Sequence, residues 1–188
     1  LEDDMDDQSR SHPDYHPSSR DVTHDDRAKA PKSALQGLYG HPIHPILVTI
    51  PLGAWTSSLV FDVIAQMADD PAPFATGSAW LIGIGAVGAV LAAVTGGLDW
   101  KMIPRGTAAW KTGLMHMLLN IGVLTLYLVN LAVRRAQGLD DVSVVALLLS
   151  VVGLAVLGAS GWLGGKLAYR YGVRVADENT QAEGFRPA

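Results

Sequence analysis

Four long segments of this chain carry almost no charge. Residues 45–67, 78–98, 113–133 and 142–163 contain no lysine or arginine and a single acidic residue, Asp62. Each segment has about 20 residues, enough for a helix rising about 1.5 Å per residue to cross the roughly 30 Å hydrocarbon layer of a bilayer. Four such helices in a water-soluble protein would leave no polar face for solvent. The pattern therefore predicts an all-α integral membrane protein.

The remaining residues divide the chain into one membrane domain, residues 37–175, and two tails. The connections between the segments are short, which favours a four-span antiparallel transmembrane helix bundle. The acidic N-terminal tail, residues 1–36, is expected to be disordered because it has too few apolar side chains to form a core. Residues 176–188 form a C-terminal tail. With flanking residues included, the expected spans are about 45–67, 78–98, 108–134 and 142–166.

The distribution of basic residues predicts an orientation. Four spans place both tails and the loop 99–112 on one side, and cytoplasmic segments of membrane proteins carry an excess of lysine and arginine. We therefore expect an inner (cytoplasmic) membrane protein with both termini in the cytoplasm. The basic residues on that side are Arg27, Lys29, Lys32, Lys101, Arg105, Lys111, Lys166, Arg170 and Arg174. The charged residues of the opposite loops are Asp69, Asp70, Arg134, Arg135, Asp140 and Asp141.

The absence of cysteine narrows the chemistry that this chain can perform. Without a thiolate, the chain itself cannot ligate an iron–sulfur cluster, form a disulfide or provide a cysteine nucleophile. The sequence shows no nucleophile–base pair, so we do not expect an enzyme. Nucleic-acid binding is not expected either, because the membrane already accounts for the basic residues at the interface.

Histidines mark the side of the membrane that carries the tails. The hexapeptide GHPIHP contains His41 and His44 and opens the first apolar segment, and His116 is the only histidine inside a segment. Ionisable residues in or at a membrane span are costly and are functional-site candidates by default. The topology brings Asp99, at the end of the second segment, to the same side. We therefore predict a metal or cofactor site formed by His41, His44, Asp99 and His116.

Haem b or a divalent metal is the expected occupant of this site, because neutral imidazole ligates haem iron, zinc and copper. Lys101, Arg105 and Lys111 lie at the same interface and are predicted to pair with haem carboxylates or a lipid phosphate. One geometric argument opposes a shared iron. His116 lies about 8 Å deeper than Lys111 on an upright helix, whereas His44 is near the surface. A purely structural hydrogen-bond network is the alternative.

Other polar residues fall inside the apolar segments. Asp62 lies about 27 Å along the helix from His44, and so belongs to the opposite side of the membrane. It is either a proton- or partner-linked carboxylate or a hydrogen-bonded acid at that interface. On the third segment a polar stripe is expected to face the interior of the bundle. Its members are Thr112, His116, Asn120, Tyr127 and Asn130.

Small residues share one face of the second segment, at Gly85, Gly88, Ala89, Ala92 and Gly96. Such faces allow helices to pack closely. A groove for a flat cofactor is the alternative interpretation of the same pattern.

Four sequence blocks carry a resemblance to a known family. They are GHPIHPILVTIPLGAW at 40–55, GLDW at 97–100, GLMHMLLN at 113–120 and GWLGGKLAYRYGV at 161–173. Together they resemble the predicted membrane proteins called domain of unknown function 2231. The resemblance covers residues 37–175 and implies a four-helix membrane domain.

At the level of residues, the resemblance implies that the paired histidines, Asp62, Asp99 and His116 are family-like positions. Some relatives are joined to a Rieske iron–sulfur domain, which implies membrane electron transfer. This chain has no cysteine, so its redox partner would be another polypeptide.

Three functions are compatible with these observations. The first is a redox-associated, haem-b or metal-binding, electron-transfer component of the membrane. The second is a non-catalytic accessory subunit that packs against other membrane protein subunits or forms a homo-oligomer. The third is a component of an ion or proton pathway in which Asp62, Asn120 and Tyr127 take part.

Overall fold

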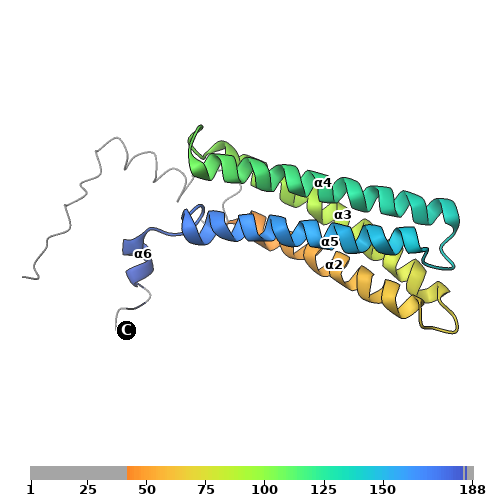
Figure 1. Cartoon of the computed structure of the whole chain (residues 1–188). Helices are drawn as coiled ribbons and strands as arrows, with labels where there is room; N and C mark the ends of the chain where they lie inside the picture. The colour runs from red at the N-terminus through yellow and green to blue at the C-terminus, as the bar shows by residue number, and fades with distance from the viewer. Residues whose placement is uncertain (1–41, 184, 186–188) are drawn as a thin grey trace, which may run out of the picture.

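The computed structural model describes residues 42–183 and 185. The N-terminal tail and His41 therefore lie outside the described residues. Every regular element within them is helical, which confirms the all-α prediction (Figure 1). The long helices are α2 (Ile43–Ala65), α3 (Ala72–Lys101), α4 (Ala108–Gln137) and α5 (Val144–Gly165). A π-helical turn, η2 (Lys166–Arg170), extends α5, and a short α6 (Glu178–Glu183) follows within the C-terminal tail.

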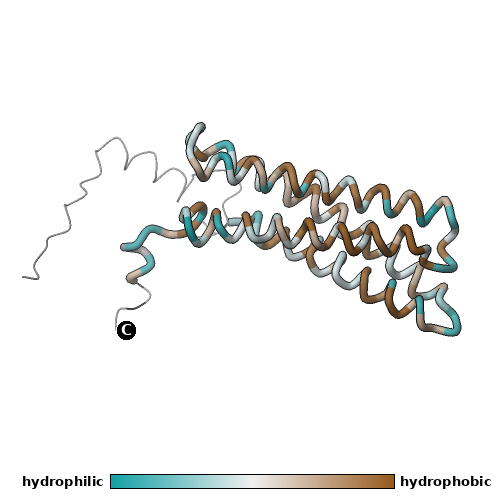
Figure 2. The backbone as a smooth tube through the Cα atoms, viewed as in Figure 1, coloured by the Kyte–Doolittle hydropathy of each residue, from teal (hydrophilic) through white to brown (hydrophobic). Residues whose placement is uncertain are grey.

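The four long helices are the four predicted membrane spans, because each is long and apolar enough to cross a bilayer. Large apolar side chains cover the outside of the bundle, including Val60, Val87 and Leu148, each more than half exposed. Hydrophilic residues concentrate at the two ends of the bundle, and the middle is hydrophobic (Figure 2). An apolar outer surface bounded by polar ends is what a bilayer stabilises. The protein is therefore an integral membrane protein.

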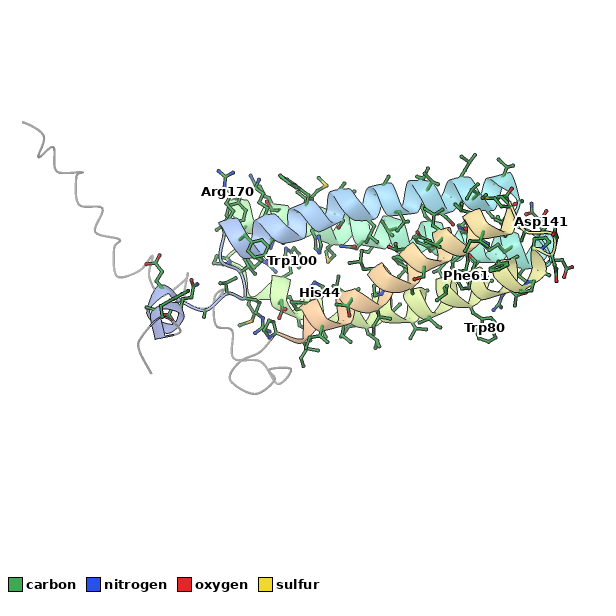
Figure 3. All side chains as sticks on the ribbon, turned by 90° about the horizontal axis from the view of Figure 1, so that it is seen from below. His44, Phe61, Trp80, Trp100, Asp141 and Arg170 are labelled. Atoms are coloured by element: carbon green, nitrogen blue, oxygen red, sulfur yellow. The ribbon has the colours of Figure 1, made fainter. Side chains whose placement is uncertain are left out.

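The helices alternate in direction and leave the bundle with two chemically different ends. At one end, which we call the histidine end, α2 and α4 begin and α3 and α5 finish. At the other, the far end, short loops join α2 to α3 and α4 to α5. Figure 3 shows His44, Trp100 and Arg170 toward the histidine end and Asp141 at the far end. The closest pairings are within these two hairpins, followed by α3 with α4, and α2 packs less extensively against α5.

α3 extends beyond the expected span 78–98 at both ends, whereas α4 begins where expected and ends three residues beyond the expected span 108–134. α3 and α4 have 30 residues each, about 45 Å at 1.5 Å per residue, against a hydrocarbon layer of roughly 30 Å. The Thr107 side chain caps the start of α4 by accepting a hydrogen bond from the Trp110 amide at 3.1 Å. Gly138, with φ of 99°, ends it. The additional turn of α3 carries Asp99 on a helix, and α4 continues past Arg134 so that this residue lies inside a helix.

The core of the bundle is centred on one aromatic pair. The rings of Trp55 on α2 and Tyr127 on α4 stack with centroids 4.1 Å apart and planes 8° from parallel. The Trp55 indole donates to the Ile82 carbonyl at 3.2 Å. Gly85 lies against the indole, and Gly153 on α5 lies against the phenol ring of Tyr127. Glycine at these positions lets two large rings fit between closely packed helices, which is the packing role predicted for small residues.

Replacement of Gly153 by alanine tests this packing. A Cβ at residue 153 would come 2.8 Å from the Tyr127 ring, so the stacked pair must shift. Overpacking of this kind costs about 1–3 kcal/mol. We expect a lower thermal unfolding midpoint in detergent for Gly153→Ala. The control is Gly158→Ala on the same helix, where a Cβ meets open space and the midpoint should hold or rise. Equal midpoints for the two variants would contradict the packing role.

Candidate functional site

A cavity of about 570 Å³ opens within the histidine end of the bundle. All four long helices contribute to its wall, together with Val173 and Arg174 from the segment after η2. The wall is largely aliphatic and aromatic, with a few polar groups contributed by His44, Asp99, His116, Asn120 and Arg174. A mostly apolar cavity of a few hundred cubic ångströms with a small number of placed polar groups is the usual form of a ligand or cofactor site.

Two imidazoles come together in this cavity. The ring centroids of His44 on α2 and His116 on α4 are 6.4 Å apart, with planes 89° to each other. The expected difference in depth between them is therefore wrong. α4 begins at Ala108, about two turns before His116, whereas α2 begins at Ile43, one residue before His44. Because the starts of the two helices are staggered along the bundle, the two histidines lie close together.

Backbone carbonyls fix the tautomer of both imidazoles. Nδ1 of His44 lies 2.8 Å from the Ala92 carbonyl oxygen, and Nδ1 of His116 lies 2.8 Å from the Ser160 carbonyl oxygen. A carbonyl oxygen only accepts hydrogen bonds, so Nδ1 must carry the hydrogen and donate it. Nε2 of each neutral ring then keeps its lone pair, which is the form that binds a metal ion.

Each imidazole also rests against a glycine of a neighbouring helix. A Cβ on Gly96 of α3 would lie 2.8 Å from Cε1 of His44, and one on Gly164 of α5 would lie 3.2 Å from Cε1 of His116. Gly96 belongs to the small-residue face predicted on the second span. Part of that face therefore serves the histidine cavity, while Gly85 and Gly88 serve packing against Trp55 and Ile50.

Asn120, a member of the predicted polar stripe, lies beside His116 and contacts it. Its Nδ2 donates to the His116 carbonyl at 2.9 Å and to Ser160 Oγ at 2.8 Å, and lies 3.2 Å from His116 Nε2. Ser160 Oγ is in turn 3.0 Å from His116 Nδ1. This network ties α4 to α5 beside the cavity and holds the orientation of the His116 ring.

Asp99 borders the cavity and forms an ion pair with Arg174. The Asp99 Oδ1 atom accepts a hydrogen bond from Arg174 Nε at 2.9 Å and a second from Nη2.

Of the predicted ligand set, the structure brings His44 and His116 together and places Asp99 on the same cavity wall, while His41 is not described. Within residues 42–183 and 185, no three His, Cys, Asp or Glu side chains form a cluster that could hold a metal ion.

The basic residues predicted to serve the cofactor are at the right end of the bundle but outside the cavity. Lys101, Arg105 and Lys111 are exposed and do not contribute to its wall. Arg174 is the basic side chain that contributes to the cavity wall, although the sequence predicted it only as a charge at the membrane interface. The preceding Gly172 was the available signal, since its φ of 67° turns the chain back toward the bundle.

A second buried polar cluster lies toward the far end and joins all four helices. Asp62 is fully buried, and its Oδ2 lies 2.6 Å from Nη2 of Arg134, which is 2% exposed. Ser78 on α3 donates to Asp62 Oδ1 at 2.6 Å, and Ser150 on α5 donates to Oδ2 at 3.0 Å. Asn130 accepts from Arg134 Nε at 2.8 Å. Asp62 thus lies apart from the histidines, as predicted. Arg134, expected in a loop, is instead its helical partner.

The predicted polar stripe therefore serves two separate clusters. Tyr127 donates from its hydroxyl to the Ser150 carbonyl at 3.3 Å, and Asn130 donates to Ser150 Oγ at 2.9 Å. Both residues belong to the Asp62 cluster, whereas Asn120 belongs to the histidine cavity. The stacked rings of Trp55 and Tyr127 lie between the two clusters and separate them.

A bundle of four apolar helices with a histidine-bearing cavity at one end defines a four-span integral membrane protein. The chain belongs to the family described as predicted membrane protein (DUF2231), which it matches over residues 40–177. This confirms the resemblance drawn from the four sequence blocks. No match was found among curated proteins or among solved structures.

The two adjacent arginines of α4 provide a test of the buried cluster. Arg134→Gln leaves the Asp62 carboxylate buried without its charge partner, and breaking one side of a buried pair costs about 3–5 kcal/mol. Arg135→Gln changes an exposed side chain and should stay within about 0.5 kcal/mol. Unfolding in mixed detergent micelles measures both. The double variant Asp62→Leu with Arg134→Met should recover much of the loss, and a double variant no better than Arg134→Gln would argue against the ion pair as the cause.

Proposed function

We propose that this protein is a membrane electron-transfer component that holds one haem b in the histidine cavity, with His44 and His116 as the axial ligands. The observation that carries the proposal is the pair of imidazoles facing one cavity from two helices, each with its Nδ1 hydrogen donated to a backbone carbonyl.

The separation of the rings suits this role. Two imidazoles on opposite sides of one iron need roughly 2 Å for each metal–nitrogen bond and roughly 1 Å from each nitrogen to its ring centre, about 6 Å in total. The centroids of His44 and His116 are 6.4 Å apart. Rotation of either ring about its metal–nitrogen bond does not alter that distance, so the 89° angle between the planes is compatible with axial ligation.

Small residues border the space in which a flat macrocycle would lie. They come from the two helices that do not carry the ligands, and include Ala92 and Gly96 on α3 and Gly161 and Gly164 on α5. The aliphatic wall excludes water, and the carbonyl bonds to Nδ1 orient the imidazoles and increase their basicity. A bound haem supplies one-electron exchange. A haem held by both His44 and His116 would supply electron transfer rather than oxygen binding.

A divalent metal fits the described residues less well. Structural and catalytic zinc sites use at least three protein ligands, whereas the described part of the cavity offers two imidazoles, and the Asp99 carboxylate is paired with Arg174. A site for zinc or copper would have to draw on His41. Haem b needs only the two imidazoles that the cavity brings together.

The hydrogen bonds and ion pairs of the structure give weaker support to the other two functions, an ion or proton pathway and an accessory subunit. Asp62 is held by Arg134, Ser78 and Ser150, which suits a structural bond between helices better than a carboxylate that gains and loses protons during transport. An accessory subunit would not require two imidazoles fixed in the same tautomer beside a cavity. Other membrane protein subunits or a second copy remain compatible with the redox role, since the electrons need a donor and an acceptor.

Replacement of the histidines tests the proposal directly. Protein purified in mild detergent after haem supplementation should show a Soret band, and His44→Ala or His116→Ala should remove it because one axial ligand is lost. Gly96→Ala should weaken haem binding, since its Cβ would displace the His44 ring, whereas Gly83→Ala on the same helix meets open space outside the cavity wall and serves as the control. A wild-type protein without a Soret band after supplementation would overturn the proposal.

We further propose that the histidine end faces the cytoplasm. Lys101, Arg105, Lys111, Lys166 and Arg170 cluster there. At the far end Arg134 is buried in an ion pair, so Arg135 is the basic residue left among the acidic loop residues Asp69, Asp70, Asp140 and Asp141. This charge difference follows the positive-inside rule.

A topology reporter tests the orientation. Alkaline phosphatase, which is active only outside the cytoplasm, should be inactive when fused to the C-terminus and active when inserted after Asp70 in the loop between α2 and α3. The reverse pattern would show that the histidine end faces outward.

A further inference from the structure

The segment that follows η2 borders the cavity at the histidine end. Backbone hydrogen bonds tie it to the end of α5, from the Gly172 amide to the Ala168 carbonyl at 3.1 Å and from the Val173 amide to the Leu167 carbonyl at 3.0 Å. Val173 and Arg174 then border the cavity. The chain therefore returns over the cavity instead of continuing away from the membrane.

Arg174 adopts a strained backbone conformation at this position. Its φ of 61° makes it the one non-glycine residue with positive φ in the described part of the chain. Such a conformation costs about 1–3 kcal/mol and persists where other interactions hold it. The ion pair with Asp99 is one such interaction. The result is that a guanidinium is held at the cavity wall at an energetic cost, as is common for functional residues.

Arg174 places a positive charge beside the largely apolar cavity. Its side chain is 10% exposed and that of Asp99 is 14% exposed. Among the described residues, Arg174 is the only lysine or arginine in the cavity wall, because Lys101, Arg105 and Lys111 lie outside it. A cation beside an apolar cavity attracts an anion strongly, since little water screens the interaction. A guanidinium carries five N–H donors in a planar fork, and arginine pairs with carboxylates through charge-assisted hydrogen bonds.

We infer that Arg174 is the anion-recognition residue of this cavity, and that it binds a propionate carboxylate of the haem while Asp99 holds its guanidinium in place. The inference rests on the proposed function, and it adds that Arg174 would help to determine which ligand the cavity binds. The two imidazoles would select a metal-centred planar ligand. Arg174 would select one that carries a carboxylate at the histidine end, through the charge-assisted hydrogen bonds that arginine forms with carboxylates.

The experiment compares two ligands on four proteins. The ligands are haem b and haem b dimethyl ester, in which both carboxylates are masked and the iron and macrocycle are unchanged. The proteins are the wild-type chain, Arg174→Gln, Arg174→Lys and Arg170→Gln. Arg170 is the matched control because it is exposed and lies outside the cavity wall. The readout is the dissociation constant from titration of the Soret band in detergent.

We expect the wild-type protein to bind haem b about 10- to 100-fold more tightly than the ester, as one hydrogen-bonded charge pair would provide. Arg174→Gln should remove this preference by weakening haem b binding without changing binding of the ester. Arg174→Lys retains the charge without the planar fork and should give an intermediate preference. It also serves as the second variant should Arg174→Gln fail to fold. Arg170→Gln should behave as wild type.

Two results would overturn the inference and leave the haem proposal in place. One is a wild-type protein that binds both ligands equally. The other is an Arg174→Gln variant that weakens both ligands by the same factor, which would mean that Arg174 only anchors the C-terminal segment. If the folded wild-type protein gives no Soret band with either ligand, the proposed function fails, and the inference fails with it.

Discussion

The ion pair between Asp62 and Arg134 joins the two helical hairpins toward the far end of the bundle. Asp62 lies on α2 and Arg134 on α4, and serines from α3 and α5 complete the bonding of the carboxylate. In a medium without water, each of these polar groups must find its partner inside the protein. Among the buried side-chain atoms that the structure describes, only Nη1 of Arg134 lacks a hydrogen-bond partner. The cluster thus fixes how the hairpins face each other toward the far end.

This fixed far end allows the histidine end to remain open. The cavity there removes apolar contacts between the hairpins, and an apolar void costs stability in proportion to its volume. The stacked pair Trp55 and Tyr127 and the Asp62 cluster supply the packing and bonding that the cavity end lacks. A bundle arranged in this way can hold two imidazoles near one another without a bound group, because helix positions are determined elsewhere in the molecule.

The main elements of the fold follow from the sequence, but the relations between them do not. Charge-free segments long enough to span a bilayer predicted four helices, and His44 and His116 were rightly assigned to the same end of the bundle. Hydropathy placed Arg134 in a loop because it treats every arginine as a cost, although an arginine with a buried carboxylate partner belongs inside a helix. The stagger that aligns His44 with His116 depends on packing between helices distant in sequence. Arg174 itself adopts a left-handed conformation without being a glycine, so Gly172 was the local signal that the chain turns there.

The aromatic stack at the centre of the bundle has a consequence for the energetics of the proposed redox role. Because Trp55 and Tyr127 fill the space between α2 and α4, the cavity is confined to the part of the bundle next to the histidine end. Work against the transmembrane potential is about 2.3 kcal/mol for each elementary charge moved across 100 mV. An electron that enters and leaves on the same side of the membrane crosses none of that potential overall. Its transfer would therefore store no energy in the membrane, and its equilibrium would be the same in energised and de-energised cells.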